Sequence, residues 1–167
     1  MKRTLVLIRH AKSSWSNPGE ADFERPLNDR GERDAPRMGA RLKELNIRPD
    51  LIISSPAKRA KQTAKRIAEA VDYEKARILY EERLYHATPE AIEEVISAVK
   101  NECATVYVVG HNPGITELAN MQTDRFRTDN MPTCAAVCVQ VDADGWSDYR
   151  KANKEALIYE YPKKLWH

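Results

Sequence analysis

Residues 4–13 read TLVLIRHAKS, an apolar run that stops abruptly at an arginine and a histidine. An uninterrupted apolar run of this length is typical of a strand buried on both faces of a parallel sheet. Ligands of open α/β sheets bind in the crevice beyond the carboxyl ends of such strands. Arg9 and His10 are therefore predicted to lie at the edge of the sheet where chemistry takes place.

Residues 105–114 repeat this arrangement with the sequence TVYVVGHNPG, in which a second apolar run ends at Gly110 and His111. Buried parallel strands of one sheet present their carboxyl ends at the same edge. His10 and His111 are therefore predicted to approach one another although they lie far apart in the chain. This convergence is the main sequence indication of a functional site.

The chain has the length and composition of a globular domain. Its 167 residues are 42% hydrophobic and 31% charged, which predicts one domain over residues 1–167. The formal net charge of +2 gives no indication of nucleic-acid binding, and no apolar run approaches the roughly 20 residues that cross a membrane. The first apolar run ends at Arg9, too early for a signal peptide, so we expect a cytoplasmic protein. The cysteines are odd in number and lack metal-ligand spacing, which predicts reduced thiols at Cys103, Cys134 and Cys138.

Apolar segments alternate between strand and helix patterns along the chain. Strands are predicted over 4–8, 51–53, 76–80, 105–109, 134–141 and 156–161, the last two joined by a turn at 142–145. Helices are predicted over 29–45, from 55–56 onward, from 88–90 onward and over 115–121. Strands that alternate with helices predict the fold class α/β, here a three-layer α/β/α sandwich with a mostly parallel central sheet.

Two of these helices carry particular start signals. Pro36 inside the first helix predicts a later start or a kink, because proline cannot donate the i→i−4 hydrogen bond. Ser55 is predicted to cap the second helix, with Pro56 at its first position. Arg59 then lies in the first turn of that helix, where the helix N-terminus also favours an anion.

The residue types at these strand ends and at this helix start favour a phosphate site. Arg9 and Arg59 supply guanidinium groups, His10 and His111 supply imidazoles, and no acidic residue lies among them in the three motifs. Planar guanidinium groups pair bidentately with phosphate oxygens, and a neutral imidazole is a competent nucleophile toward phosphorus. The four residues therefore predict phosphoryl transfer through a covalent phosphohistidine.

Other roles for the histidines fit the sequence less well. A histidine after a strand often serves only as a buried hydrogen-bonding group, but two matched positions and a basic helix start favour a functional site. Metal binding is disfavoured because His10, His86 and His111 have no Asp or Cys at ligand spacing, and flanking arginines repel a cation. Residues 110–114 match neither glycine-rich nucleotide motif, so no nucleotide cofactor is expected.

Three motifs, in order, resemble those of the histidine phosphatase superfamily, which has the phosphoglycerate mutase-like fold. They are Arg9-His10-Ala11, the segment 54–64 with the sequence SSPAKRAKQTA, and the segment 110–114 with the sequence GHNPG. The segment 25–31, RPLNDRG, and the short chain resemble the SixA branch of protein-phosphohistidine phosphatases. The resemblance implies that His10 is the nucleophile, that Arg9, Arg59 and His111 form the phosphate pocket, and that no metal or organic cofactor is needed.

One departure from the family pattern bears on the substrate. Ester-hydrolysing relatives carry a carboxylic general acid in a leucine-x-glutamate context, where this chain has Leu84, Tyr85 and His86. An alkoxide leaving group needs a proton, whereas imidazole, with a pKa of about 6.5, leaves far more readily. The missing acid therefore favours a phosphohistidine substrate. Another backbone path could still bring in an acid from one of three nearby carboxylates, Glu81, Glu82 or Glu90.

The sequence leaves three functions open. The first is hydrolysis of phosphohistidine in a protein such as a phosphotransfer domain, and the second is hydrolysis of a small phosphomonoester by the same nucleophile. The third is a phosphate-binding module without activity, which does not need an in-line nucleophile. A mutase is disfavoured because 167 residues leave little room for insertions that enclose its substrate. No nucleic-acid or membrane partner is expected, and Lys12 and Ser13 either contact phosphate or face solvent.

Overall fold

The computed structural model describes residues 1–166, and it has an α/β fold built on one six-stranded sheet. The strands are β1 (Lys2–Arg9), β2 (Leu51–Ser54), β3 (Leu79–Tyr80), β4 (Thr105–Gly110), β5 (Ala136–Asp142) and β6 (Asn153–Glu160). The α-helices are α1 (Asp29–Glu44), α2 (Lys58–Ala70), α3 (Pro89–Ser97), α4 (Gly114–Asn120) and α5 (Pro162–Trp166). Four short 3₁₀ helices are found within the described residues, namely η1 (Asp22–Glu24), η2 (Lys75–Arg77), η3 (Glu82–Leu84) and η4 (Trp146–Asp148).

The order of the strands across the sheet is β3-β2-β4-β1-β5-β6. The neighbours from β3 to β1 pair in parallel, whereas β5 pairs antiparallel with both β1 and β6. The sheet is therefore mixed and mostly parallel, which confirms the predicted fold class. The predicted domain ended at residue 167, and that last residue lies outside the described residues.

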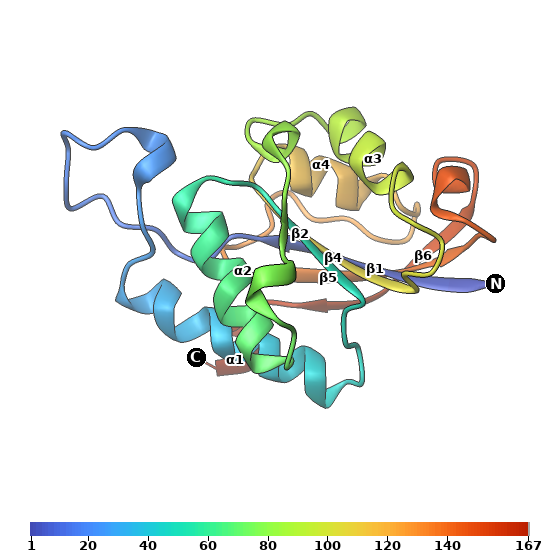
Figure 1. Cartoon of the computed structure of the whole chain (residues 1–167), viewed down its shortest axis with the longest axis horizontal. Coiled ribbons are helices and arrows are strands. Elements are labelled where there is room, and N and C mark those ends of the chain that lie inside the picture. The colour runs from blue at the N-terminus through green and yellow to red at the C-terminus, as the bar shows by residue number, and fades with distance from the viewer. Residues whose placement is uncertain (167) are drawn as a thin grey trace.

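Helices cover both faces of the sheet, with α1 and α2 on one face and α3 and α4 on the other (Figure 1). Alternate residues of β1 supply the two cores, because successive side chains of a strand point to opposite faces. Leu5 and Leu7 pack in the core that includes Ile92 of α3, whereas Val6 and Ile8 pack in the core on the side of α1 and α2. The strand is buried on both faces, as its uninterrupted apolar run predicts.

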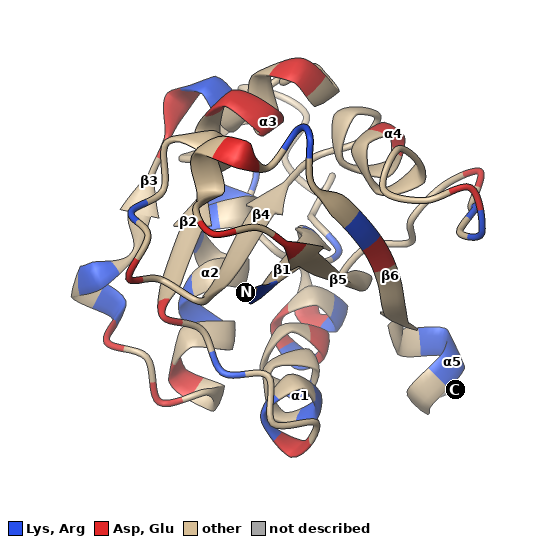
Figure 2. Ribbon diagram, turned by 90° about the vertical axis from the view of Figure 1, so that its right-hand side faces the viewer, with Lys and Arg blue, Asp and Glu red and all other residues tan. Residues whose placement is uncertain are grey.

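Charged residues lie on the outer elements of the sandwich. Figure 2 shows acidic and basic residues on α1 and on the edge strand β6 and acidic residues on α3, whereas β4 in the middle of the sheet carries no charged residue. Charged side chains are therefore rare in the middle of the sheet, and Arg9 at the end of β1 is one of the few.

Most predicted elements are confirmed, but three details of the prediction are wrong. The first helix is not one of them, because it begins at Asp29 as predicted, capped by the side chain of Asn28, and continues through Pro36; of the two alternatives that Pro36 predicted, the later start does not occur. The strand predicted over 76–80 is reduced to two residues, because 75–77 form a 3₁₀ turn. The link between β5 and β6 is longer than the predicted turn at 142–145 and contains η4.

The start of α2 is the third wrong detail. This helix begins at Lys58, and Ala57 occupies the cap position without a side-chain hydrogen bond. The Ser55 hydroxyl accepts a hydrogen bond from the backbone N–H of Ala57 and also contacts His111. Ser55 therefore precedes the helix and is engaged at the site described below.

Candidate active site

The register of β1 and β4 brings the two histidines together. Arg9 is paired with Gly110 across these parallel strands, so the residues that follow, His10 and His111, leave the sheet side by side. Their ring centroids are 5.1 Å apart, and the side chains are only 6% and 9% exposed. The predicted convergence of the two strand ends is thus what the structure shows.

His10 has one ring nitrogen committed to the backbone and the other facing a guanidinium group. Nδ1 lies 2.8 Å from the carbonyl oxygen of Ala11, which can only accept, so Nδ1 carries the proton. Nε2 accepts a hydrogen bond of 3.3 Å from Nε of Arg59. Burial, followed by the charges of His111 and the arginines, lowers the pKa of His10 to about 3. At neutral pH the ring is therefore uncharged, with its lone pair on Nε2.

His111 is oriented by Ser55 in a similar way. Its Nε2 lies 2.8 Å from the Ser55 hydroxyl, and that hydroxyl already accepts from Ala57, so it can donate its own proton to the ring. The neutral ring then carries its proton on Nδ1, which is buried without a hydrogen-bond partner in the described structure. Burial is the main cause that lowers the pKa of His111 to about 3.

The two arginines complete the group. Arg59, from the first turn of α2, is 5% exposed. Arg9 is half-buried, and its Nη1 donates a 2.8 Å hydrogen bond to the carbonyl of Met131. Nε of Arg9 is buried with no partner among residues 1–166. A buried donor is costly unless something pairs with it, and an anion would pair with both Arg9 Nε and His111 Nδ1.

One pocket of about 230 Å³ is lined by all six residues that the sequence singled out for the site. They are Arg9, His10, Lys12, Ser13, Arg59 and His111. Lys12 is exposed at its mouth, whereas the buried Ser13 hydroxyl accepts a 2.7 Å hydrogen bond from Arg25. Their roles in binding phosphate stay predictions. Trp15 also lines this pocket and is 73% exposed. The guanidinium carbon of Arg25 lies over the Trp15 ring, 3.6 Å from the ring centroid.

An acidic residue does reach the site, contrary to the expectation from the motifs. Asp22 lies in η1, in the segment between β1 and α1 that extends away from the sheet (Figure 1). Its Oδ2 accepts hydrogen bonds from Arg59 Nη2 at 3.1 Å and from the Tyr85 hydroxyl at 2.6 Å. Its Oδ1 accepts from Arg25 Nε at 3.2 Å. The Tyr85 hydrogen bond, followed by the arginines, holds the pKa of Asp22 well below its usual range, so the carboxylate is ionised.

Sequence reasoning missed Asp22 because an irregular segment has no periodicity that predicts where its side chains point. Tyr85 was noted only as part of the stretch where relatives carry a general acid, yet its ring packs edge-on against His111, with the ring centroids 5.5 Å apart. Burial, followed by the neighbouring Asp22, raises the pKa of Tyr85.

The three carboxylates considered as general acids lie elsewhere. Glu81 forms a 3.2 Å ion pair with Arg83, Glu82 is exposed, and Glu90 lies near the start of α3. None of them is among the residues that line the phosphate pocket. The described backbone therefore does not bring any of the three into this pocket.

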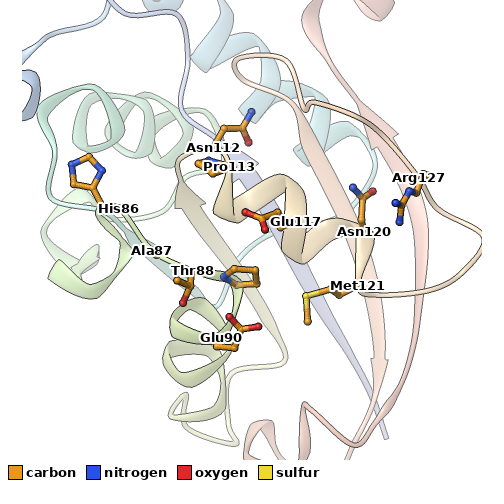
Figure 3. Close-up of a pocket in the computed structure, with 11 residues that line it drawn as sticks. His86, Ala87, Thr88, Glu90, Asn112, Pro113, Glu117, Asn120, Met121 and Arg127 are labelled. Atoms are coloured by element: carbon orange, nitrogen blue, oxygen red, sulfur yellow. The ribbon is translucent and has the colours of Figure 1, made fainter.

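A larger groove of about 680 Å³ adjoins the phosphate pocket and shares Asn112 with it. Figure 3 shows this groove between the start of α3 and the length of α4, with His86 at one end and Arg127 at the other. Its exposed charges are Glu90, Glu117 and Arg127, none of which forms an ion pair within the described residues. The groove is thus open, polar and next to the pocket.

Two other kinds of feature are absent from residues 1–166. In the part of the chain that the structure describes, no group of three or more His, Cys, Asp or Glu side chains is arranged to hold a metal ion. Over the same residues, every helix is too short or too polar to cross a membrane.

Known proteins resemble this chain in sequence and in fold. The model of the histidine phosphatase superfamily (branch 1) matches residues 5–95. A Mycobacterium tuberculosis protein is 35% identical over 165 residues, covering 93% of this chain and 100% of that protein. The structure of SixA from Agrobacterium tumefaciens is 28% identical, covers 96% of this chain and 99% of its own, and has a TM-score of 0.78. A SixA structure complexed with tungstate is 20% identical, covers 97% of this chain and 99% of its own, and with a TM-score of 0.83 shows the same fold.

The family match covers more than half of the chain, including the segments that contain His10 and Arg59. The Mycobacterium relative extends the likeness over nearly the whole length, past His111. On these grounds the chain belongs to the histidine phosphatase superfamily.

Proposed function

We propose that this protein is a phosphatase that transfers the phosphoryl group of its substrate to Nε2 of His10 and then hydrolyses the phosphohistidine formed. The observation that carries this proposal is the state of His10, a neutral ring whose lone pair lies on the nitrogen that faces Arg59. Membership of the superfamily and the SixA structures among its neighbours support a phosphate hydrolase.

The first step needs an anion site beside the nucleophile. The guanidinium groups of Arg9 and Arg59 and the Nδ1 proton of His111 would bind the phosphoryl oxygens and offset their charge. The Nε2 lone pair of His10 then forms a bond to phosphorus, while the bond from phosphorus to the leaving atom breaks and its electron pair stays with that atom. The residues that supply these contacts need no metal ion.

The second step regenerates His10. The oxygen of a water molecule forms a bond to phosphorus, the bond from phosphorus to Nε2 breaks, and inorganic phosphate leaves with the hydrogens of the water. The ring returns to its neutral form because the carbonyl of Ala11 keeps a proton on Nδ1 throughout. A neutral imidazole is a good leaving group, since its conjugate acid has a pKa of about 6.5.

The substrate that we propose is phosphohistidine in a protein. No carboxylic acid is among the residues that line the phosphate pocket, and Asp22 beside it is ionised, so an alkoxide leaving group would lack a strong donor. A phosphorus–nitrogen bond does not require that donor. The open groove next to Asn112 also supplies room for a large group that carries the phosphoryl. The neighbour from Agrobacterium tumefaciens is itself assigned as a phosphohistidine phosphatase.

A labelling experiment tests the covalent step. After rapid mixing with ³²P-labelled substrate and quenching without acid, we expect label on His10, and we expect none on the His10→Ala variant, whose turnover should be lost although it folds. Label on a carboxylate or a cysteine, or full activity of His10→Ala, would refute the proposal.

A substrate panel tests the leaving group. We expect phosphohistidine to be cleaved much faster than a simple alkyl phosphate, because only the ester needs a proton from the enzyme. Comparable rates would instead favour hydrolysis of a small phosphomonoester by the same nucleophile.

A further inference from the structure

The ionised carboxylate of Asp22 competes with phosphate for Arg59. Along one edge of that guanidinium, Nε donates to His10 Nε2 at 3.3 Å and Nη2 donates to Asp22 Oδ2 at 3.1 Å. Nη1 donates to the backbone oxygen of Asp22 at 2.7 Å. Guanidinium groups use two neighbouring donors to bind phosphate. A phosphoryl group that takes the Nε and Nη2 edge must therefore replace Asp22 Oδ2 on Arg59.

Asp22 has other partners that hold it in place when this exchange occurs. Arg25 donates to Oδ1 from Nε and lies within 3.2 Å of it through Nη2, and the Tyr85 hydroxyl donates to Oδ2 at 2.6 Å. Once Arg59 turns to the phosphoryl group, Oδ2 keeps the Tyr85 bond and gains a free lone pair. The freed lone pair would then be next to the phosphoryl group, where it could accept a hydrogen bond from an N–H of the leaving group.

We infer that Asp22 is a specificity-determining residue, which accepts a hydrogen bond from the N–H of a nitrogen leaving group and disfavours bare phosphate. This inference rests on the proposed function and names the feature of the substrate that the site selects. Asp22 would do for the substrate ring what the carbonyl of Ala11 does for His10, which is to keep a proton on the nitrogen that does not bear phosphorus.

The proposed step balances without a proton donor. His10 Nε2 forms its bond to phosphorus, the bond from phosphorus to the substrate ring breaks, and the electron pair stays on that ring nitrogen. The ring leaves as neutral imidazole, because its other nitrogen already carries a proton held by Asp22. Without that proton the leaving group would be an imidazolate anion. Asp22 therefore raises the fraction of substrate in the reactive, protonated form.

The test is Asp22→Asn, which keeps the shape of the side chain but removes its charge. For free phosphohistidine we expect kcat/KM to fall about 10- to 100-fold, the range that a hydrogen bond to a charged group contributes. We also expect the fall of activity at high pH to move to lower pH, because the substrate ring loses its proton more readily. For 4-nitrophenyl phosphate, whose leaving group needs no proton, we expect kcat/KM to rise. Inorganic phosphate should inhibit Asp22→Asn more strongly than the wild type, because the side chain that competes with phosphate for Arg59 is no longer charged.

Two further variants act as controls. Tyr85→Phe removes one of the hydrogen bonds that hold Asp22. Like Asp22→Asn, it should lower the ratio of kcat/KM for free phosphohistidine to kcat/KM for 4-nitrophenyl phosphate, but by a smaller factor. Glu24→Gln removes a negative charge from the same 3₁₀ helix, where Glu24 is exposed, and should change the ratio by less than about twofold.

Each outcome separates the inference from the proposed function. An equal loss on both substrates in Asp22→Asn would mean that Asp22 only positions Arg59, and no change on either would mean that it has no role. Either result overturns the inference while the function stands. A wild-type protein that does not cleave phosphohistidine overturns the proposed function. If inhibition by inorganic phosphate is also unchanged in Asp22→Asn, then Asp22 does not compete with phosphate for Arg59.

Discussion

The phosphate pocket and the neighbouring groove meet at Asn112 but are built differently. In the pocket, His10, Arg59 and His111 are nearly buried, and each has at least one fixed hydrogen-bond partner. In the groove, Glu117 and Arg127 are exposed and take part in no ion pair among the described residues. Buried groups with fixed partners are suited to chemistry, because they are oriented before the ligand arrives. Exposed charges are suited to recognition, because water solvates them until a partner binds.

Arg59 should show the largest effect, because it links the nucleophile to the rest of the pocket. We expect Arg59→Ala to lower kcat/KM for 4-nitrophenyl phosphate by about 10²- to 10³-fold, as the loss of one preorganised donor does in other sites. Arg59→Lys should recover only part of this, since an ammonium group cannot bind phosphate through two fixed donors. Lys58→Ala, at the exposed neighbouring position, is the matched control. A decrease of threefold or less in kcat/KM for Arg59→Ala would mean that Arg59 does not take part in catalysis.

The dependence of stability on pH should separate the pocket, which contains two buried histidines, from the groove. His10 and His111 have pKa values of about 3 when folded, against about 6.5 unfolded. Between these values the unfolded chain binds more protons, so the free energy of unfolding falls as the pH falls through this window. At pH 5 the expected loss is about 2 kcal/mol for each of the two histidines.

Urea unfolding at pH 7 and pH 5 checks this expectation. His10→Asn should reduce the difference between the free energies of unfolding at the two pH values, whereas Met121→Gln, which changes an exposed side chain of the groove, should leave that difference as in the wild type. If Met121→Gln reduced the difference as much as His10→Asn, burial in the pocket could not be its cause.

Ser55 offers a smaller change at the pocket, because it acts through His111. Ser55→Ala removes the hydroxyl that faces His111 Nε2, and we expect kcat/KM to fall about tenfold, the value of one hydrogen bond of about 1.4 kcal/mol. Ser54→Ala is the matched control, because the buried Ser54 hydroxyl donates to the carbonyl of Ser55 and does not touch the histidine. Equal losses of activity in the two variants would indicate a general loss of packing.

The groove should give the smallest effect. Reversing the charge in Glu117→Lys is expected to change the ratio of kcat/KM for a phosphohistidine-bearing protein to that for free phosphohistidine by about three- to tenfold. The reason is that Glu117 lines the groove (Figure 3) and not the phosphate pocket, so we expect only the larger substrate to reach it. A ratio equal to that of the wild type would show that the groove does not contact the protein substrate.

The parts of the site that the sequence predicted are those that regular structure fixes. His10 and His111 follow apolar strands, and Arg59 lies at the start of a helix. The periodicity of the sequence and the common edge of parallel strands therefore predicted that all three lie at one edge of the sheet. Two glycines then allow the irregular segments to approach closely. A Cβ on Gly31 would clash with the carbonyl oxygen of Lys12, and one on Gly114 would clash with that of Ala87. No pattern in the sequence predicts these contacts, because they join segments that are distant in the chain.

The amino-acid sequence by itself determined the order of strands and helices, the residues that face the core and the side chains delivered to the edge of the sheet. These follow from local periodicity and from the geometry of parallel strands. The tertiary structure alone decided that Asp22 reaches Arg59, that Tyr85 holds Asp22, and that Ser55 serves His111 instead of capping α2. The reason is physical: a hydrogen bond between distant segments depends on the path of the whole backbone, which local preferences do not fix.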